Sequence, residues 1–257
     1  MAGTPHRSDV NFDRVAADYD ATRGGDARAI ACARDVAPHL PPGDTLEIGV
    51  GTGIVAAAVR AEAPHVVRLV GIDISVEMLA RASQRLPGAV VRASALRLPF
   101  GDARFDAALA VHVLHLVPDM GAALAEAARV LRPGGRLVAV HGESQHSDDV
   151  LAEVLSPLLD LAGPRPDSPE AVVAAAARAG LTCVEQRPTS PRISEYSPAQ
   201  LADSISGRMW SYMWTIDDET WATRVVPVID AVRALPDPER LRPHESRMTL
   251  TVLERAG

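Results

Sequence analysis

Residues 46–53, Leu46-Glu47-Ile48-Gly49-Val50-Gly51-Thr52-Gly53, decide the fold of this chain. An apolar run ends at Ile48, three glycines follow at alternate positions, and helix-forming residues occupy 54–60. This order predicts a strand, a tight turn and the start of a helix. Glycine suits the turn because a Cβ excludes the backbone angles that it needs, and because a ligand can then contact the main chain. The N–H groups at the start of a helix favour anionic or electron-rich ligand groups.

The spacing of the glycines distinguishes two kinds of ligand-binding turn. The dinucleotide fingerprint has glycine at its first, third and sixth places. Counted from Gly49, glycine here takes the first, third and fifth places, and Ile54 stands at the sixth. With Glu47 two residues before the first glycine, the stretch resembles motif I of the class I S-adenosylmethionine-dependent methyltransferases. A buried turn between a strand and a helix, without a ligand, is the alternative.

Composition and charge bound the class of protein. The chain has 257 residues, of which 47% are apolar, and these suffice for one large α/β domain or for one domain with an insertion. All 26 basic residues are Arg, and 33 acidic residues bring the net charge to −7. Nucleic-acid-binding proteins usually carry a basic excess on one face. No such excess is visible here, so the composition disfavours a nucleic-acid partner.

The cysteines and the start of the chain bear on its compartment. Cys32 and Cys183 lie far apart without partners at metal-ligand spacing, so we interpret both as small buried hydrophobes in a reducing compartment. Residues 1–9 lack the apolar segment of a signal peptide, and no run is long enough to cross a bilayer. We expect a cytoplasmic protein without a metal or a membrane partner.

The first 40 residues carry a helical pattern. Its first apolar side chains, at helical spacing, are Val10, Phe12, Val15, Ala16 and Tyr19. Gly24-Gly25 interrupts the pattern and residues 27–40 resume it, which predicts a helical cap over residues 1–40. Residues 12–20 are similar to a segment that folds over the cofactor in small-molecule methyltransferases, and this resemblance places Tyr19 near the methionine portion and the substrate. The alternative is an amphipathic helix that caps the core, with Tyr19 half buried.

A second strand is expected at residues 66–73, whose unbroken apolar run is typical of a buried parallel strand. Asp73 ends it at the carboxyl edge, where open α/β sheets bind ligands. Its carboxylate can accept two charge-assisted hydrogen bonds from a ribose diol. The resemblance to the family's second motif implies that Asp73 holds the ribose and that Ile74 contacts the cofactor. Asp73 as the N-cap of a helix at 76–85 is the alternative, although Ser75 can take that place.

The segment after a short strand at 89–92 departs from the family pattern. The family usually has Gly-Asp-Ala-Glu-x-Leu-Pro-Phe here, with the aspartate at the adenine amino group. This chain keeps Ala95 and residues 98–100 but has Ser94 in place of the aspartate. Ser94 and Ala95 are therefore expected at the adenine edge, through a neutral hydrogen bond that is weaker, bridged by water or shared with the backbone of Ala95.

Two histidines follow the fourth expected strand, residues 105–111. Val111 ends the strand, and His112 and His115 come next, where such sheets hold catalytic groups. The family often has a Leu-His pair beside the cofactor at the position of His115, which also implies cofactor contact at Val111. Histidine titrates near neutrality, so His115 first, and His112 second, can take a proton from a hydroxyl, an amine or an acidic carbon. The alternative is a structural histidine, and a metal site would need more ligands.

The remaining core elements also follow the family pattern. Residues 126–135 closely match its segment Glu-x-x-Arg-Val-Leu-x-Pro-Gly-Gly, whose role there is structural, and a strand at 136–140 leads to His141 and Glu143. Both side chains are expected either to face the substrate or to be solvated at a loop mouth. Further helices are expected at 147–162 and 168–179, and strands at 181–186 and 247–253.

Residues 187–246 have few equivalents in a minimal core of this fold. In a chain with 4% aromatic residues, they hold a cluster of aromatic and methionine side chains: Tyr196, Met209, Trp210, Tyr212, Met213, Trp214 and Trp221. Such side chains shape apolar pockets and grip flat ligands. We expect a lid that contacts the substrate through Tyr196, Trp210 and Trp214. The alternatives are an insertion packed on the core and the surface of a homodimer.

Together these resemblances imply a class I methyltransferase of the small-molecule kind. Its fold would be α/β, a Rossmann-like doubly wound sheet of seven strands in the order 3-2-1-4-5-7-6, with the last strand antiparallel and an inserted helical lid. The expected regions are the cap at 1–40, the core at 41–186 and 246–257, and the lid at 187–245.

The same resemblance implies the activity. Gly49, Gly51 and Gly53, with Glu47, would lie at the methionine end of S-adenosylmethionine, and the acceptor would be a small molecule, with secondary metabolism as one setting. One alternative is a protein that binds the cofactor without methylating, as a cyclase or a regulator. A methyltransferase that acts on RNA or protein is the other, and the acidic net charge disfavours it.

Overall fold

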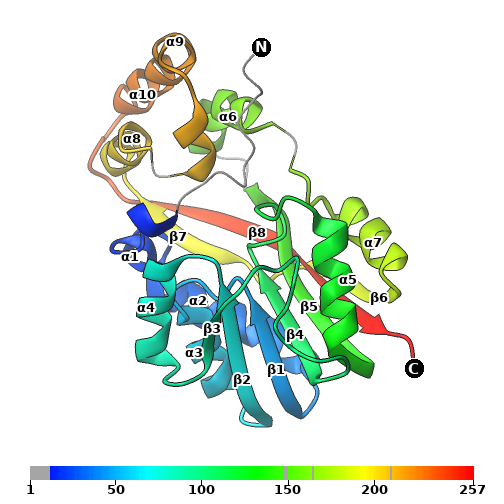
Figure 1. Cartoon of the computed structure of the whole chain (residues 1–257). Coiled ribbons are helices and arrows are strands. Elements are labelled where there is room, and N and C mark those ends of the chain that lie inside the picture. The colour runs from blue at the N-terminus through cyan, green and yellow to red at the C-terminus, as the bar shows by residue number, and fades with distance from the viewer. Residues whose placement is uncertain (1–11, 147–149, 164, 209) are drawn as a thin grey trace. The chain divides into compact units, whose positions relative to one another are not determined.

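The computed structural model describes residues 12–146, 150–163, 165–208 and 210–257 (Figure 1). At Arg14, residues 143–146 and Ser211 it describes the backbone alone. The predictions that concern Val10, Met209 and the side chain of Glu143 lie outside the described residues.

The chain divides into two compact units, each with its own apolar core. The sheet unit comprises residues 11–143, 166–190 and 248–257, and the helical unit comprises residues 144–165 and 191–247. The sequence analysis placed residues 144–165 with the sheet. They group instead with the insertion because their helix contributes to the same apolar cluster as the insertion's helices.

The described residues form one eight-stranded sheet, in the order β3-β2-β1-β4-β5-β8-β6, with β7 paired to β8. Strands β1, β2, β3, β4 and β5 pair in parallel, and β6 is antiparallel to β8. The predicted order is confirmed, because the short β7 is an addition and β8 is the predicted seventh strand. The strands are β1 Gly43–Ile48, β2 Val66–Asp73, β3 Val90–Arg92, β4 Phe105–Val111, β5 Leu131–His146, β6 Leu181–Pro188, β7 Arg192–Tyr196 and β8 Arg242–Arg255.

Helices of both units follow the predicted pattern from β1 onward. In the sheet unit they are η2 Phe12–Arg14, α1 Tyr19–Thr22, α2 Gly25–Val36, η3 Ala37–His39, α3 Ile54–Glu62, α4 Val76–Arg85, α5 Met120–Val130 and α7 Pro169–Arg178. In the helical unit they are α6 Val150–Ala162, α8 Pro198–Ser206, η4 Ser211–Thr215, α9 Asp218–Thr220, η5 Trp221–Val225 and α10 Val226–Arg233. The N-terminal segment differs from the prediction, because η2 and the four-residue α1 replace a continuous first helix.

The sheet unit has three layers, with α2, α3 and α4 on one face of the sheet and α5 and α7 on the other (Figure 1). Successive residues of β4 alternate between the two cores. Leu109 and Val111 belong to the first cluster and Ala108 and Ala110 to the second. A strand covered on both faces buries the side chains on both, which explains why every residue of β4 except Asp106 is apolar and buried.

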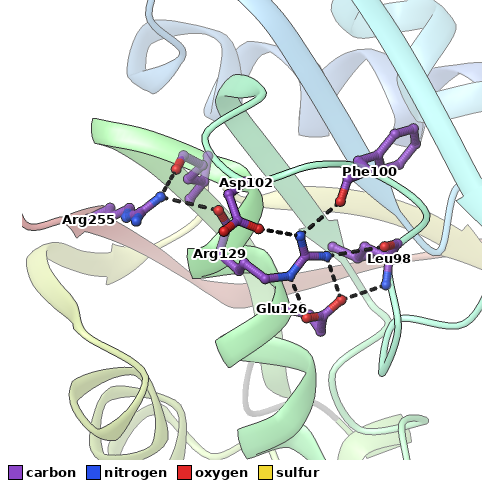
Figure 2. Close-up of polar contacts among 7 residues, drawn as sticks. Leu98, Phe100, Asp102, Glu126, Arg129 and Arg255 are labelled. Carbon is purple, nitrogen blue, oxygen red and sulfur yellow. Dashed lines mark hydrogen bonds and ion pairs between the residues drawn. The ribbon is translucent and has the colours of Figure 1, made fainter.

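Arg129, near the end of α5, fixes the loop that leads into β4. Its guanidinium donates to both carboxylate oxygens of Glu126, to Asp102 and to the carbonyls of Leu98 and Phe100, over 2.7 to 3.1 Å (Figure 2). Glu126 in turn accepts the N–H of Leu98 over 2.7 Å. One planar cation therefore satisfies two carboxylates and two carbonyls, which gives the motif at 126–135 its structural role.

Replacement of Arg129 by Met tests this role. The variant leaves the Glu126 carboxylate and the Leu98 and Phe100 carbonyls without their donor, so we expect a loss of about 2 to 4 kcal/mol in the free energy of unfolding. Urea denaturation measures it. Arg178→Met, at an exposed position of α7, is the matched control and should change stability by less than about 0.5 kcal/mol. Equal losses in the two variants would contradict the assignment.

Candidate functional site

The glycine turn joins β1 to α3 and is fixed to the carboxyl end of β2. Its glycines adopt φ values that L side chains rarely take, +73° at Gly49, +54° at Gly51 and +76° at Gly53. The N–H of Gly49 donates to the carbonyl of Ile72 over 2.9 Å, and that of Gly51 donates to Asp73 Oδ2 over 2.9 Å. The first two strands and the turn between them thus meet at one edge of the sheet.

Free space differs from one glycine of the turn to the next. A Cβ at Gly49 would lie 2.5 Å from the side chain of Val113, and one at Gly53 would lie 3.1 Å from Ala82. A Cβ at Gly51 would meet no atom of the described residues within 4 Å. The outer glycines therefore serve close packing, whereas Gly51 leaves its main chain open to a ligand.

Asp73 ends β2, and a backbone N–H donates to each of its carboxylate oxygens. Oδ2 accepts from Gly51 and Oδ1 accepts from Ser75, both over 2.9 Å. Ser75 itself is the N-cap of α4, since its hydroxyl accepts the N–H of Met78 over 3.1 Å. The Asp73 carboxylate therefore keeps lone pairs for a ligand. Ile74 beside it is 61% exposed, which is unusual for an isoleucine next to a core strand.

Glu47 lies on the neighbouring strand β1 and is almost fully buried. Its Oε2 atom has no hydrogen-bond partner within the described part of the chain. Burial, together with the negative charge of Asp73, raises the pKa of Glu47 to about 8. A buried polar atom without a partner costs about 1 to 3 kcal/mol. A group of this kind in a native fold points to a ligand, and here to a cationic hydrogen-bond donor.

Two aspartates attach the N-terminal segment to the loops around this edge. Asp13 Oδ1 accepts the hydroxyl of Ser75 over 2.5 Å. Asp20 accepts the hydroxyl of Thr52, in the glycine turn, over 2.6 Å and pairs with Arg85 over 2.7 Å. These tertiary bonds explain why the predicted continuous helix is replaced by short pieces, because they hold the two carboxylates at two different loops.

Tyr19 lies between these two attachment points and is half buried. Its ring meets that of Phe12 edge-on, with centroids 6.1 Å apart, and Arg23 lies over its face at 5.6 Å. Because the next residue, Asp20, bonds to the glycine turn, the segment that carries Tyr19 is tied to the turn directly.

Ser94 and Ala95 follow β3 next to the end of β2. The N–H of Ala93 donates to the backbone carbonyl of Asp73 over 3.0 Å, so the segment begins beside the candidate ribose ligand. Ser94 is exposed, and its hydroxyl accepts the N–H of Leu96 over 3.2 Å. This local bond leaves the hydroxyl proton and a second lone pair for a ligand.

His112 and His115 follow β4 in different surroundings. His112 has a φ of +54°, a conformation that costs a non-glycine residue roughly 1 kcal/mol and is concentrated at functional sites. Its N–H donates to the carbonyl of Val140 over 2.8 Å, directly after the buried Val111. The side chain of His115 is 13% exposed, and its Nδ1 lies 3.6 Å from Oδ2 of Asp167.

His141 is fully buried and does not lie at a loop mouth. Its Nδ1 is 2.9 Å from the carbonyl oxygen of Asp167, and its Nε2 is 2.8 Å from the hydroxyl of Thr251. The sequence placed His141 just after a strand at 136–140 and so suggested a substrate contact, but β5 continues through it and residues distant in sequence close over the ring. We therefore remove His141 from the substrate-facing residues.

Asp167 is the polar residue of this region that the sequence analysis missed. It is fully buried, and its Oδ2 accepts the N–H of Gly142 over 3.2 Å while facing His115. In the sequence it stands directly before Ser168, whose hydroxyl caps α7, so it reads as part of an ordinary helix start. The available sequence signal was an acidic residue placed directly between Pro166 and the capping Ser168.

The aromatic residues of the predicted lid pack within the helical unit. Met213 is fully buried, and Trp210 and Trp221 pack against the same apolar cluster. The guanidinium of Arg208 lies 4.0 Å from the ring centroid of Trp221. The backbone carbonyl of Arg208 accepts the indole N–H of Trp214 over 2.6 Å. Internal packing accounts for most of these side chains, and their contact with a substrate stays a prediction.

Over the described ranges, no group of three or more His, Cys, Asp or Glu side chains is arranged to hold a metal ion. No helix in those ranges is long and apolar enough to cross a membrane.

Comparisons with known proteins show what the segment around this edge of the sheet is similar to. A family described as "Methyltransferase domain" matches residues 46–139, which run from β1 and the glycine turn into β5. A demethylmenaquinone methyltransferase of Mycolicibacterium gilvum is 40% identical over 140 residues, which are 52% of this chain and 59% of that protein. A 27-O-demethylrifamycin SV methyltransferase of Amycolatopsis mediterranei is 42% identical over 106 residues, 38% of each chain.

A solved structure extends the likeness to nearly the whole chain. The cyclase SpnF superposes with a TM-score of 0.61 at 18% identity, over 98% of this chain and 97% of that one. At this identity the likeness concerns the fold, which is the α/β architecture predicted from the sequence.

The raised pKa of Glu47 predicts how stability depends on pH. Between its ordinary value of 4.5 and about 8, the folded chain holds a proton that the unfolded chain has lost, so stability falls as the pH rises through this window. Glu47→Gln removes the effect. Relative to wild type, the variant should gain at least about 1 kcal/mol between pH 5 and pH 8 in urea denaturation. Glu170→Gln, at an exposed site, should gain nothing, and a flat difference for both variants would refute the burial of Glu47 as a neutral acid.

Proposed function

We propose that this chain, whose residues 46–139 match the methyltransferase domain family, transfers a methyl group from S-adenosylmethionine to a small organic acceptor. The observation that carries the proposal is the open main chain of Gly51, whose N–H donates to the carboxylate of Asp73, together with the buried Glu47 on the strand before the turn. The cofactor carries a ribose diol, an ammonium group and an adenine, and each has a chemical counterpart here.

The residues at the carboxyl edge of the sheet fit this cofactor. The buried, unpartnered Oε2 of Glu47 suits the ammonium group, because a cationic donor satisfies the atom and favours its ionised form. Asp73 keeps lone pairs for the ribose hydroxyls. The exposed Ile74 offers an apolar surface for the adenine, and Ser94 and Ala95 offer polar groups at its edge. The same edge includes Gly49, Gly53 and Val111, and Tyr19 lies on the segment tied to it.

Methyl transfer from this cofactor requires no covalent bond between the substrate and a side chain of the protein. S-adenosylmethionine supplies an electrophilic methyl group on a positively charged sulfur. The chain contributes alignment of the acceptor and exclusion of water, effects that reach about 7 to 11 kcal/mol in favourable intramolecular cases. A base is needed only where the acceptor must lose a proton, and His115 is our first choice, with His112 second.

The acceptor class is proposed from the relatives and the composition. The two relatives are named for demethylmenaquinone and 27-O-demethylrifamycin SV, both small molecules. The net charge of −7 disfavours RNA. We further propose that Tyr196, Trp210 and Trp214 contact the acceptor, that the protein acts in the cytoplasm, and that it can form a homodimer.

One other function has specific support. The cyclase SpnF shares the fold over nearly its whole length, and Ser94 replaces the usual aspartate at the adenine edge. A protein that binds the cofactor without transferring its methyl group would show both features.

The deciding experiment separates the two functions. The full chain is incubated with S-adenosylmethionine labelled in its methyl group and with a library of phenols, enols, amines and thiols. Appearance of label in a library compound supports methyl transfer. Calorimetric binding of the cofactor without transfer to any compound favours the cyclase or regulatory function, and absence of binding defeats both.

Replacement of Gly51 by Ala tests the open main chain. The new Cβ meets no protein atom, so the fold should lose only the roughly 1 to 2 kcal/mol that φ near +54° costs an L residue. It would occupy the space assigned to the cofactor, and we expect the Kd for S-adenosylhomocysteine to rise at least tenfold in calorimetry.

The matched control for this variant is Gly88→Ala. Gly88 has a φ of +72° and equally open surroundings, but it lies in the turn between α4 and β3. The control should carry a similar strain and bind the cofactor like the wild type. Equal affinities of the two variants would place the cofactor elsewhere.

A further inference from the structure

Asp167 is a fully buried carboxylate within the sheet unit, directly before the N-cap of α7. Its Oδ2 accepts the N–H of Gly142, within β5, over 3.2 Å. The same oxygen lies 3.6 Å from Nδ1 of His115, after β4. A contact of 3.6 Å lies within ion-pair range, and a shift of about 0.5 Å would make it a hydrogen bond.

The surroundings of Asp167 favour the ionised carboxylate. An isolated buried charge is costly unless it is paired or hydrogen bonded. Here the N–H of Gly142 donates to it, and it stands at the positive end of the ten-residue helix α7. The third partner is the imidazole of His115. A carboxylate accepts hydrogen bonds but cannot donate, so it selects an imidazole that carries its proton on Nδ1.

A second histidine, His141, forms a hydrogen bond with the backbone carbonyl of Asp167. The carbonyl of Asp167 can only accept, so His141 must donate from its Nδ1 over 2.9 Å. The Nε2 atom of the same ring lies 2.8 Å from the hydroxyl oxygen of Thr251. The Thr251 oxygen in turn accepts from the side-chain amide of Gln186 over 3.0 Å. This buried chain of bonds leaves the loop of Asp167 little freedom to move.

We propose that Asp167 is a positioning residue that holds His115 with its proton on Nδ1, so that Nε2 serves as the base for an acceptor with a phenolic or enolic hydroxyl. This inference rests on the proposed methyl transfer and names its acceptor class. As the acceptor oxygen forms its bond to the methyl carbon, the sulfur–carbon bond breaks and its electron pair stays on sulfur. The hydroxyl proton passes to Nε2 of His115, and the Asp167 carboxylate stabilises the resulting imidazolium until solvent takes the proton.

The test reads the protonation site of His115 directly. The full chain is labelled with 15N-histidine, and the His115 signals are assigned by their loss in His115→Gln. In the wild type, nitrogen NMR over a pH series should show the neutral ring protonated on Nδ1. In Asp167→Asn, which keeps the size and an acceptor oxygen, the population protonated on Nε2 should rise at least tenfold. Asp26→Asn, at an exposed position of α2, is the matched control and should leave the signals unchanged.

Two spectroscopic outcomes would overturn the positioning role of Asp167, and neither depends on an identified acceptor. One is a wild-type His115 protonated mainly on Nε2. The other is an identical pattern in wild type and Asp167→Asn. Cofactor affinity separates this from the proposed function, because Asp167→Asn should bind S-adenosylhomocysteine as the wild type does. Absence of that binding in the wild type would refute the cofactor site while the histidine spectra still decide the role of Asp167. Methyl transfer confined to amines or thiols in the library would refute the acceptor class.

Discussion

The hydrogen bond from the N–H of Gly51 to the carboxylate of Asp73 is the constraint on which the candidate site depends. It joins the turn after β1 to the end of β2 and makes one edge from two strands. The parallel register, with Ile48 beside Ile72, brings the two ends level. Asp13 and Asp20 then attach the N-terminal segment to the loops at this edge. The glycines allow the arrangement, because their φ values exclude most side chains.

The same edge places two acids in opposite electrostatic conditions. Asp73 accepts two backbone N–H groups and keeps access to a ligand, whereas Glu47 is buried behind it with a raised pKa. Two carboxylates this close would repel if both were ionised. A ligand that brings a cation to Glu47 and hydroxyl donors to Asp73 relieves both conditions.

Sequence patterns predicted those features that local rules determine. The strands β2 and β4, the glycine turn, and Ser75 as a helix cap depend on neighbours within a few residues, and the structure confirms them. The burial predicted for β2 is only partly correct, because Val67 and Arg68 are exposed. Features that depend on distant partners were not predictable. His141 is buried because Thr251 bonds to it from 110 residues away, and Asp167 matters because of His115 and Gly142. The helical spacing around Phe12 and Tyr19 was misleading, since aspartates on the same segment bond to other loops.

The central claim is that Glu47 is a neutral acid in the free protein and becomes ionised when the cofactor's ammonium group binds beside it. Calorimetry tests this claim most directly. S-adenosylhomocysteine carries the ammonium group but no charge on sulfur, so its binding isolates the interaction. Titrations of the full chain near pH 7, in two buffers of different ionisation enthalpy, should give binding heats that differ by the release of up to about one proton. The release should vanish in Glu47→Gln. Binding without proton release, or no binding heat at all, would contradict the claim.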